Sequence, residues 1–131
     1  MRTEVKLEKM KATELRIGNW IHYSSKVGMD EGDIQCETFH MDEMRNNSKY
    51  SYSPILLTED ILLKKGFEKK YSNVFGTGKS TSYKYGRFEL YLNEELDYGK
   101  YRHGSGVYIS YLHELQNLYF VLTGYELKIE L

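Results

Sequence analysis

The string GTGKST at residues 76–81 contains the Lys-Ser pair of loops that bind nucleotide phosphates. Such a loop needs a glycine where Asn73 stands, a hydrophobic strand before it and a helix that begins at the Lys-Ser pair. Here the polar segment FEKKYS precedes the string, and a segment with strand periodicity follows it. We therefore interpret residues 73–81 as a glycine-rich hairpin loop and not as a phosphate site.

Histidine and cysteine side chains are the next candidates, because they ligate metal ions. Cys36 and His40 would share one face of a strand, but about 13 Å of strand would separate them, which is too far for one zinc ion. The acidic clusters at residues 30–33 and 94–97 lack the spacing of a calcium loop and are typical of solvated turns. The remaining histidines, which form no local pair, are His22, His103 and His113. We predict no metal site and no cofactor.

A basic, tyrosine-rich middle offers a different chemistry. Residues 64–103 carry nine basic and five acidic side chains. Aromatic rings that stack on bases, beside cations that contact phosphates, form nucleotide and single-strand sites. Ordinary strand packing with solvated lysines explains the same residues, and the overall net charge of −1 argues against a general phosphate-backbone binder. The candidate site, if these side chains share one face, is Lys79, Tyr83, Lys84, Arg87, Lys100 and Arg102.

Alternating segments predict the strands that position these residues. Ile21 and Tyr23 would face one side of a first strand, which pairs antiparallel with a second strand at residues 34–41. Short segments from residue 73 to residue 93 would form a meander, and residues 126–131 a final strand.

Two helices are predicted from their end signals. The first covers residues 59–65, with Thr58 as N-cap and Gly66 after its last residue. The second runs from a Ser110 cap to a Gly124 stop, and its leucines recur at helical spacing. We expect Leu115, Leu118 and Leu122 to be buried against the sheet, and Leu118→Ala to cost about 2 to 5 kcal/mol.

These elements predict an α+β fold with a mainly antiparallel sheet, in the order β-β-α-β-β-β-α-β. We expect residues 1–13 to be a flexible or docking segment and residues 14–131 to form a single domain. Residues 42–53 and 93–106 have no clear pattern. One cysteine, no secretory apolar segment and no apolar run long enough for a bilayer favour a cytoplasmic location.

Three segments carry a resemblance: ATELRIGNWI at residues 12–21, LTEDILLKKGF at residues 57–67 and YLHELQNLYFVLTGYEL at residues 111–127. They resemble an uncharacterised family of short proteins from Bacteroides-type bacteria, their phages and mobile elements. The resemblance implies a cytoplasmic accessory protein of unknown activity, and it supplies no catalytic residues. The Gln116–Asn117 pair in the last segment would tie the polar side of the helix to neighbouring backbone.

No nucleophile elbow, zinc-binding HExxH helix or Cys-His signature is present, so we predict a non-enzymatic protein with no catalytic residues. Thirteen tyrosines favour contact surfaces, because each joins an apolar ring to a polar tip. The first hypothesis is a binding protein that acts by protein-protein contact, with a homodimer allowed. The alternative is a nucleic-acid or small-nucleotide binding protein, for example one that sequesters its ligand, and neither hypothesis involves a membrane.

Overall fold

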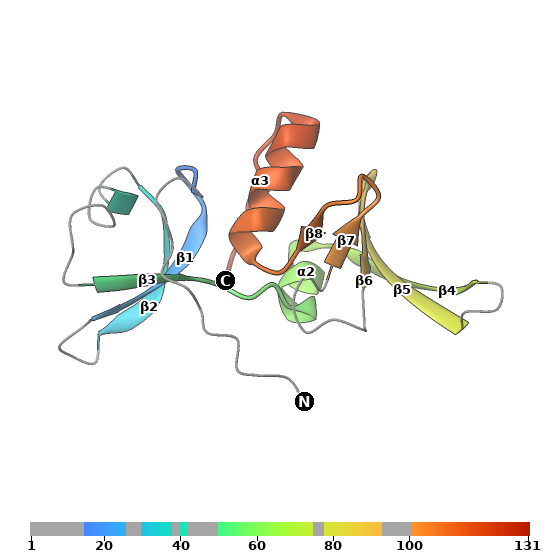
Figure 1. Cartoon of the computed structure of the whole chain (residues 1–131), viewed down its shortest axis with the longest axis horizontal. Helices are drawn as coiled ribbons and strands as arrows, with labels where there is room; N and C mark the ends of the chain where they lie inside the picture. Colours follow the sequence, from blue (N-terminus) through green and yellow to red (C-terminus); the bar gives the residue numbers. More distant parts are fainter. Residues whose placement is uncertain (1–14, 26–29, 38–39, 42–49, 75–77, 93–100) are drawn as a thin grey trace. The chain divides into compact units, whose positions relative to one another are not determined.

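A computed structural model shows the predicted α+β class, with two antiparallel sheets and two labelled helices in the described part of the chain (Figure 1). The order of elements roughly matches the prediction. The predicted flexible segment at residues 1–13 lies outside the described residues. The structure describes residues 15–25, 30–37, 40–41, 50–74, 78–92 and 101–131.

The chain divides into two compact units, which are described separately. Unit 1 contains the chain up to Leu56 together with Tyr111–Leu118, and unit 2 contains Leu57–Ser110 and Tyr119–Leu131. Helix α3 (Leu112–Thr123) therefore contributes its first part to unit 1 and its second part to unit 2. Whether residues 14–131 fold as a single domain stays a prediction.

Unit 1 contains a three-stranded antiparallel sheet. Strand β1 (Trp20–Ser25) lies between β2 (Glu31–Gln35) and β3 (Tyr50–Pro54), so the predicted pairing of the first two strands is confirmed. Ile21 is fully buried, while the other residues of β1 are half-buried. The core cluster of this unit consists of Leu15, Ile21, Cys36 and Tyr52.

The second strand differs from the prediction of residues 34–41, because β2 begins at Glu31 and ends at Gln35. The backbone N–H of His40 donates to Glu37 O at 2.9 Å, so the chain turns here instead of continuing as a strand. Cys36 and His40 therefore do not share a strand face. Burial in the core raises the pKa of the Cys36 thiol.

Gln116 of helix α3 binds the backbone that leads into β1. Its Oε1 accepts a hydrogen bond from the backbone N–H of Trp20 at 2.9 Å, and its Nε2 donates to Gly18 O at 3.4 Å. Gln116 is only 3% exposed, so these bonds satisfy groups that water does not reach.

Asn117 makes the corresponding contacts with side chains. Its Oδ1 accepts from Arg16 Nη1 and from Asn19 Nδ2, both at 2.9 Å. Asn19 closes the turn before β1, since its Oδ1 accepts from the backbone N–H of Arg16 at 2.7 Å. Gly18 has a φ of +96° in this turn, a backbone conformation that favours glycine. The Gln-Asn pair thus joins the helix to the start of β1: Gln116 binds backbone, as predicted for the pair, whereas Asn117 binds side chains.

Unit 2 contains a five-stranded antiparallel meander, where the predicted order has a meander of three strands. Its strands follow one another in chain order. They are β4 (Glu68–Val74), β5 (Gly78–Tyr85), β6 (Phe88–Leu92), β7 (Tyr101–His103) and β8 (Tyr108–Ile109).

The β4–β5 hairpin contains the string that resembles a phosphate-binding loop. Asn73 pairs with Lys79 and Val74 with Gly78, so the Lys-Ser pair belongs to strand β5 and does not begin a helix. The hairpin interpretation is confirmed, and residues 75–77 lie outside the described part.

Helix α2 (Glu59–Lys65) has the predicted bounds and ends. The Thr58 side chain accepts from the backbone N–H of Ile61 at 3.3 Å. Gly66 has a φ of +115°, and the N–H of Phe67 donates to Leu62 O at 3.0 Å, which is a Schellman turn. Local hydrogen bonds alone therefore set both ends of this helix.

Helix α3 begins one residue later than predicted, with Tyr111 in place of Ser110 at the N-cap position. The backbone N–H of Tyr111 donates to Glu114 Oε1 at 3.0 Å, one half of a capping box, while Ser110 O accepts from the N–H of Leu57. The stop is confirmed: Gly124 has a φ of +79° and donates to Phe120 O.

Burial along α3 agrees with the prediction only in the first part of the helix. Leu115 is fully buried, Leu118 is half-buried and Leu122 is 49% exposed, so the burial predicted for Leu122 is wrong. Helical spacing determines the direction of an apolar face, but not how far along the helix that face is covered.

The predicted final strand at residues 126–131 is also wrong, since no strand is formed over 124–131. Leu127 and Ile129 are nevertheless buried while Lys128 and Glu130 are exposed. The alternation thus identified an extended segment with one buried side, which forms no strand ladder.

Candidate binding site

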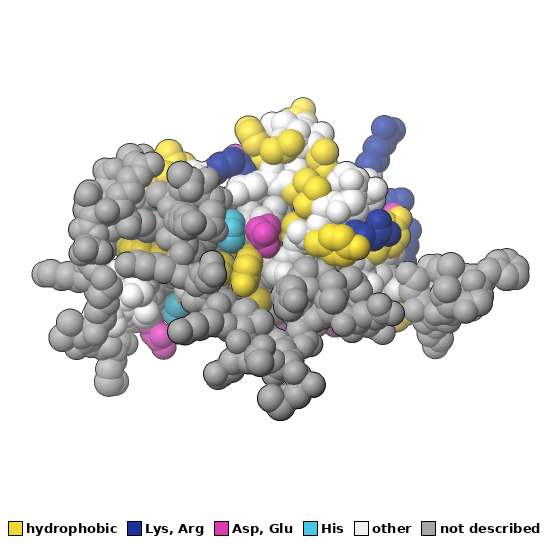
Figure 2. Space-filling view, viewed as in Figure 1, with side chains coloured by type: hydrophobic (Ala, Val, Ile, Leu, Met, Phe, Trp, Pro, Cys, Tyr) yellow, Lys and Arg dark blue, Asp and Glu magenta, His cyan; other side chains and the backbone are white. Residues whose placement is uncertain are grey.

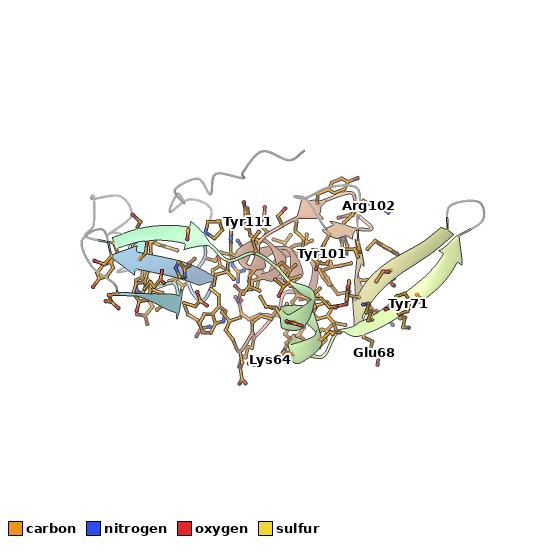
Figure 3. All side chains as sticks on the ribbon, turned by 90° about the horizontal axis from the view of Figure 1, so that it is seen from below. Lys64, Glu68, Tyr71, Tyr101, Arg102 and Tyr111 are labelled. Atoms are coloured by element: carbon orange, nitrogen blue, oxygen red, sulfur yellow. The ribbon has the colours of Figure 1, made fainter. Side chains whose placement is uncertain are left out.

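Strand register divides the predicted nucleic-acid residues between the two faces of the sheet in unit 2. Tyr83 and Tyr101 lie on one face, here called face A, because they follow the same alternation through Leu90 and Leu92. Lys84 and Arg102 lie on the opposite face, face B. Tyr101 and Arg102 are neighbours on β7 (Figure 3). The six candidates therefore do not share one face.

Tyr83 is 2% exposed on face A, so its ring has no surface for a base to stack on. Its hydroxyl donates to Glu59 Oε1 at 2.8 Å, and the same carboxylate oxygen is paired with Lys69. Burial, and then this hydrogen bond, raise the pKa of Tyr83 well above its ordinary value. The hydrogen bond that Lys69 donates to Glu59 likewise raises the pKa of Lys69. These contacts connect α2 to the sheet. The position of Tyr83 is therefore explained by packing and not by ligand binding.

The raised pKa of Tyr83 predicts a loss of stability in alkali. Above the ordinary tyrosine pKa of about 10 the unfolded chain loses the phenolic proton while the folded chain keeps it, so the free energy of unfolding falls as pH rises. Tyr83→Phe should make this fall shallower. Urea denaturation at a series of alkaline pH values measures it. An equal fall in the parent and the variant would contradict the burial of this hydroxyl.

Face B carries two described cations of the candidate set, Lys84 and Arg102. The Arg102 guanidinium lies 5.5 Å from the centre of the Tyr91 ring, and the Tyr91 hydroxyl donates to Glu89 Oε1 at 3.1 Å. Lys84 pairs with Glu89 across the strands, so an acidic group accompanies these cations. The side chain of Lys79 and all of Lys100 lie outside the described part.

Arg87 borders an open pocket in unit 2 that has no acidic lining residue, whereas the pocket that Tyr83 borders includes Glu59. The open pocket has a volume of about 370 Å³, which is within the range of small-ligand sites. Sheet residues and the second part of α3 form its wall. Lining residues are Tyr85, Gly86, Arg87, Phe88, His103, Tyr119, Leu122 and Thr123.

Aromatic rings make up much of the pocket wall. Phe88 and His103 lie face to face, with ring centres 5.0 Å apart and planes tilted by 30°. The Tyr119 ring stands edge-on to Phe88 at 5.3 Å and to Tyr85 at 6.1 Å. Contacts between rings hold this wall in place and leave Arg87 exposed at its rim.

His103 adds a hydrogen-bond donor to this wall. Its Nδ1 accepts from the backbone N–H of Ser105 at 3.1 Å, and the Ser105 hydroxyl lies 2.8 Å from the same atom. A backbone N–H can only donate, so the neutral ring carries its proton on Nε2. The imidazole therefore has an Nε2–H group available for a ligand.

An apolar surface adjoins the pocket at Leu122. We call the exposed apolar residues of this region the α3 surface, and they are Phe120 (38% exposed), Val121 (75%), Leu122 (49%) and Tyr125 (74%). Hydrophobic side chains gather over the C-terminal end of α3 in Figure 2. An exposed group of large apolar side chains is typical of an interaction site.

Sequence reasoning found Arg87 but missed the rest of the pocket. The sequence did indicate that Tyr85 and Phe88 lie side by side, because Gly86 and Arg87 form a two-residue turn between them. The approach of Tyr119 from α3 had no such signal, since it depends on how the helix packs on the sheet.

Comparison of the chain with protein-family models, curated proteins and solved structures finds no match. No helix among the described residues has the length and apolar character of a membrane span. The histidines, cysteine and carboxylates of the same residues form no group of three or more that could hold a metal ion. Arguments about function therefore start from the pocket and the α3 surface.

Proposed function

We propose that this chain is a non-enzymatic binding protein that contacts a partner protein through the α3 surface. The main support is that Val121 and Tyr125 are about three-quarters exposed, although exposing apolar surface to water costs free energy. A partner that covers them removes this cost. The interaction core of protein complexes is enriched in aromatic residues and depleted of charge, which fits Phe120 and Tyr125.

The resemblance to short proteins of Bacteroides-type bacteria, their phages and mobile elements suggests where to look for the partner. On this proposal the chain is a cytoplasmic accessory protein, and the partner is a host protein. A second copy of the chain is the other allowed partner, since a homodimer would cover the same apolar side chains.

Val121→Glu should weaken partner binding, because a charge in the centre of an apolar contact would have to be buried without a counter-ion. A protein captured from a Bacteroides-type host is purified, and its affinity for the parent and variant is measured by calorimetry. We expect the variant to bind about tenfold more weakly or worse.

Ile17→Glu is the matched control, because Ile17 is 62% exposed in unit 1 and outside the α3 surface. Its affinity should equal that of the parent. Sedimentation of the parent and of Val121→Glu tests the homodimer. If Val121→Glu binds every captured partner normally and sediments like the parent, the α3 surface is not the contact site.

A second candidate function is nucleotide binding, the alternative expected from the sequence. One observation favours it: Arg87, a member of the predicted cationic set, lies at the rim of the aromatic pocket. A free nucleotide needs only a single stacking wall and one or two cations, so this function does not require the other candidate residues to share a face.

A further inference from the structure

We infer that the pocket of unit 2 binds a planar aromatic ring that carries one anionic group, the chemistry of a nucleoside monophosphate. This inference rests on the second candidate function and is independent of the α3 surface. It assigns the ring to the aromatic wall and the anion to Arg87.

The aromatic wall suits a flat ring. Phe88 is only 5% exposed and supports His103 from behind, with the two ring planes tilted by 30°. The ring surface open to a ligand therefore comes from the partly exposed His103 and Tyr119. Stacking on such rings tolerates many bases, because every base has a π-face. A pocket of about 370 Å³ accommodates a base-sized group while its open side leaves room for the sugar and the anion.

Charge and hydrogen bonding select for an anion. Arg87 is exposed in the β5–β6 turn, and its guanidinium carries a positive charge at any physiological pH. The Nε2–H of His103 supplies a second donor, since Nδ1 is occupied by Ser105. None of the residues that line the pocket is acidic. An anionic ligand therefore meets donors there and no facing carboxylate.

The protein is titrated with AMP, adenosine and inorganic phosphate, and binding is measured by saturation-transfer NMR and calorimetry. AMP should bind about tenfold more tightly than adenosine, because only AMP offers a charged acceptor to Arg87. Inorganic phosphate alone should show no measurable binding, since it lacks the ring.

Two variants separate the two halves of the ligand. Arg87→Gln should lower the affinity for AMP to that for adenosine and leave adenosine binding unchanged. Tyr119→Leu should weaken both ligands. The matched controls lie on face B: Lys84→Gln removes a cation and Tyr108→Leu removes a ring that is 50% exposed, and both should bind AMP like the parent.

Each outcome tests a different part of the proposal. AMP binding that survives in Arg87→Gln and Tyr119→Leu would keep nucleotide binding and overturn the pocket assignment. Equal binding of AMP and adenosine would overturn the role of the anion. No binding of AMP at millimolar concentration would overturn nucleotide binding itself. Thermal melts of the four variants test whether each is folded. Gly86 is not substituted, because its φ of +62° favours glycine.

Discussion

Replacing Leu115 by alanine is expected to lower the free energy of unfolding by about 2 to 5 kcal/mol. Leu115 is fully buried in the part of α3 that belongs to unit 1. Truncation removes apolar contacts and leaves a cavity that the neighbouring side chains fill only in part. The fluorescence of Trp20, which is the single tryptophan and lies in β1 of the same unit, follows urea denaturation of unit 1.

Leu122→Ala is the matched control in the same helix. Leu122 is 49% exposed, so its truncation should change stability by no more than about 0.5 kcal/mol. Leu118 is half-buried, and its replacement should fall between the two. Equal losses in the free energy of unfolding for Leu115→Ala and Leu122→Ala would show that Leu122 is as buried as Leu115.

Gln116→Ala is expected to cost about 1 to 3 kcal/mol, because it removes the hydrogen bond that the N–H of Trp20 donates to a side chain only 3% exposed. The variant also removes a donor to Gly18 O. Gln35 provides an unusual control, since its Nε2 donates to the same Gly18 O at 3.3 Å but from an exposed position.

Gln35→Ala should therefore change stability by at most about 0.5 kcal/mol. Both variants are measured by the fluorescence of Trp20 during urea denaturation. If Gln35→Ala costs as much as Gln116→Ala, the loss comes from Gly18 O and not from the buried amide of Trp20. If neither variant loses stability, the Gln116 contacts do not hold the helix to β1.

Elements defined by local rules could be predicted from the sequence. Helix α2 has its predicted bounds, since Thr58 and Gly66 satisfy its ends without help from distant residues. The β4–β5 hairpin is similar, because glycines and alternating residues define it within a short stretch. The role of Gln116 in binding backbone was also predictable from the polar side of α3.

Features that depend on distant contacts could not be predicted. Tyr83 and Lys84 are adjacent in a basic, aromatic segment, yet one is buried against α2 and the other lies on face B. The composition of a segment does not determine its strand register, so it does not show which face of the sheet each side chain lies on. The exposed Leu122 lies seven residues after the buried Leu115 in the same helix, so helical spacing alone does not distinguish their burial.

The division of α3 between two units also has a kinetic consequence during synthesis. Strands β1 to β3 are complete by Leu56, but their helix partner ends at Leu118, 62 residues later. At about 5 to 20 residues per second the ribosome takes roughly 3 to 12 s to make this stretch. The hairpins of unit 2 join consecutive strands and form within microseconds once their chain is available. Strands β1 to β3 are therefore made seconds before their helix partner, and their apolar face is exposed to chaperones in the interval.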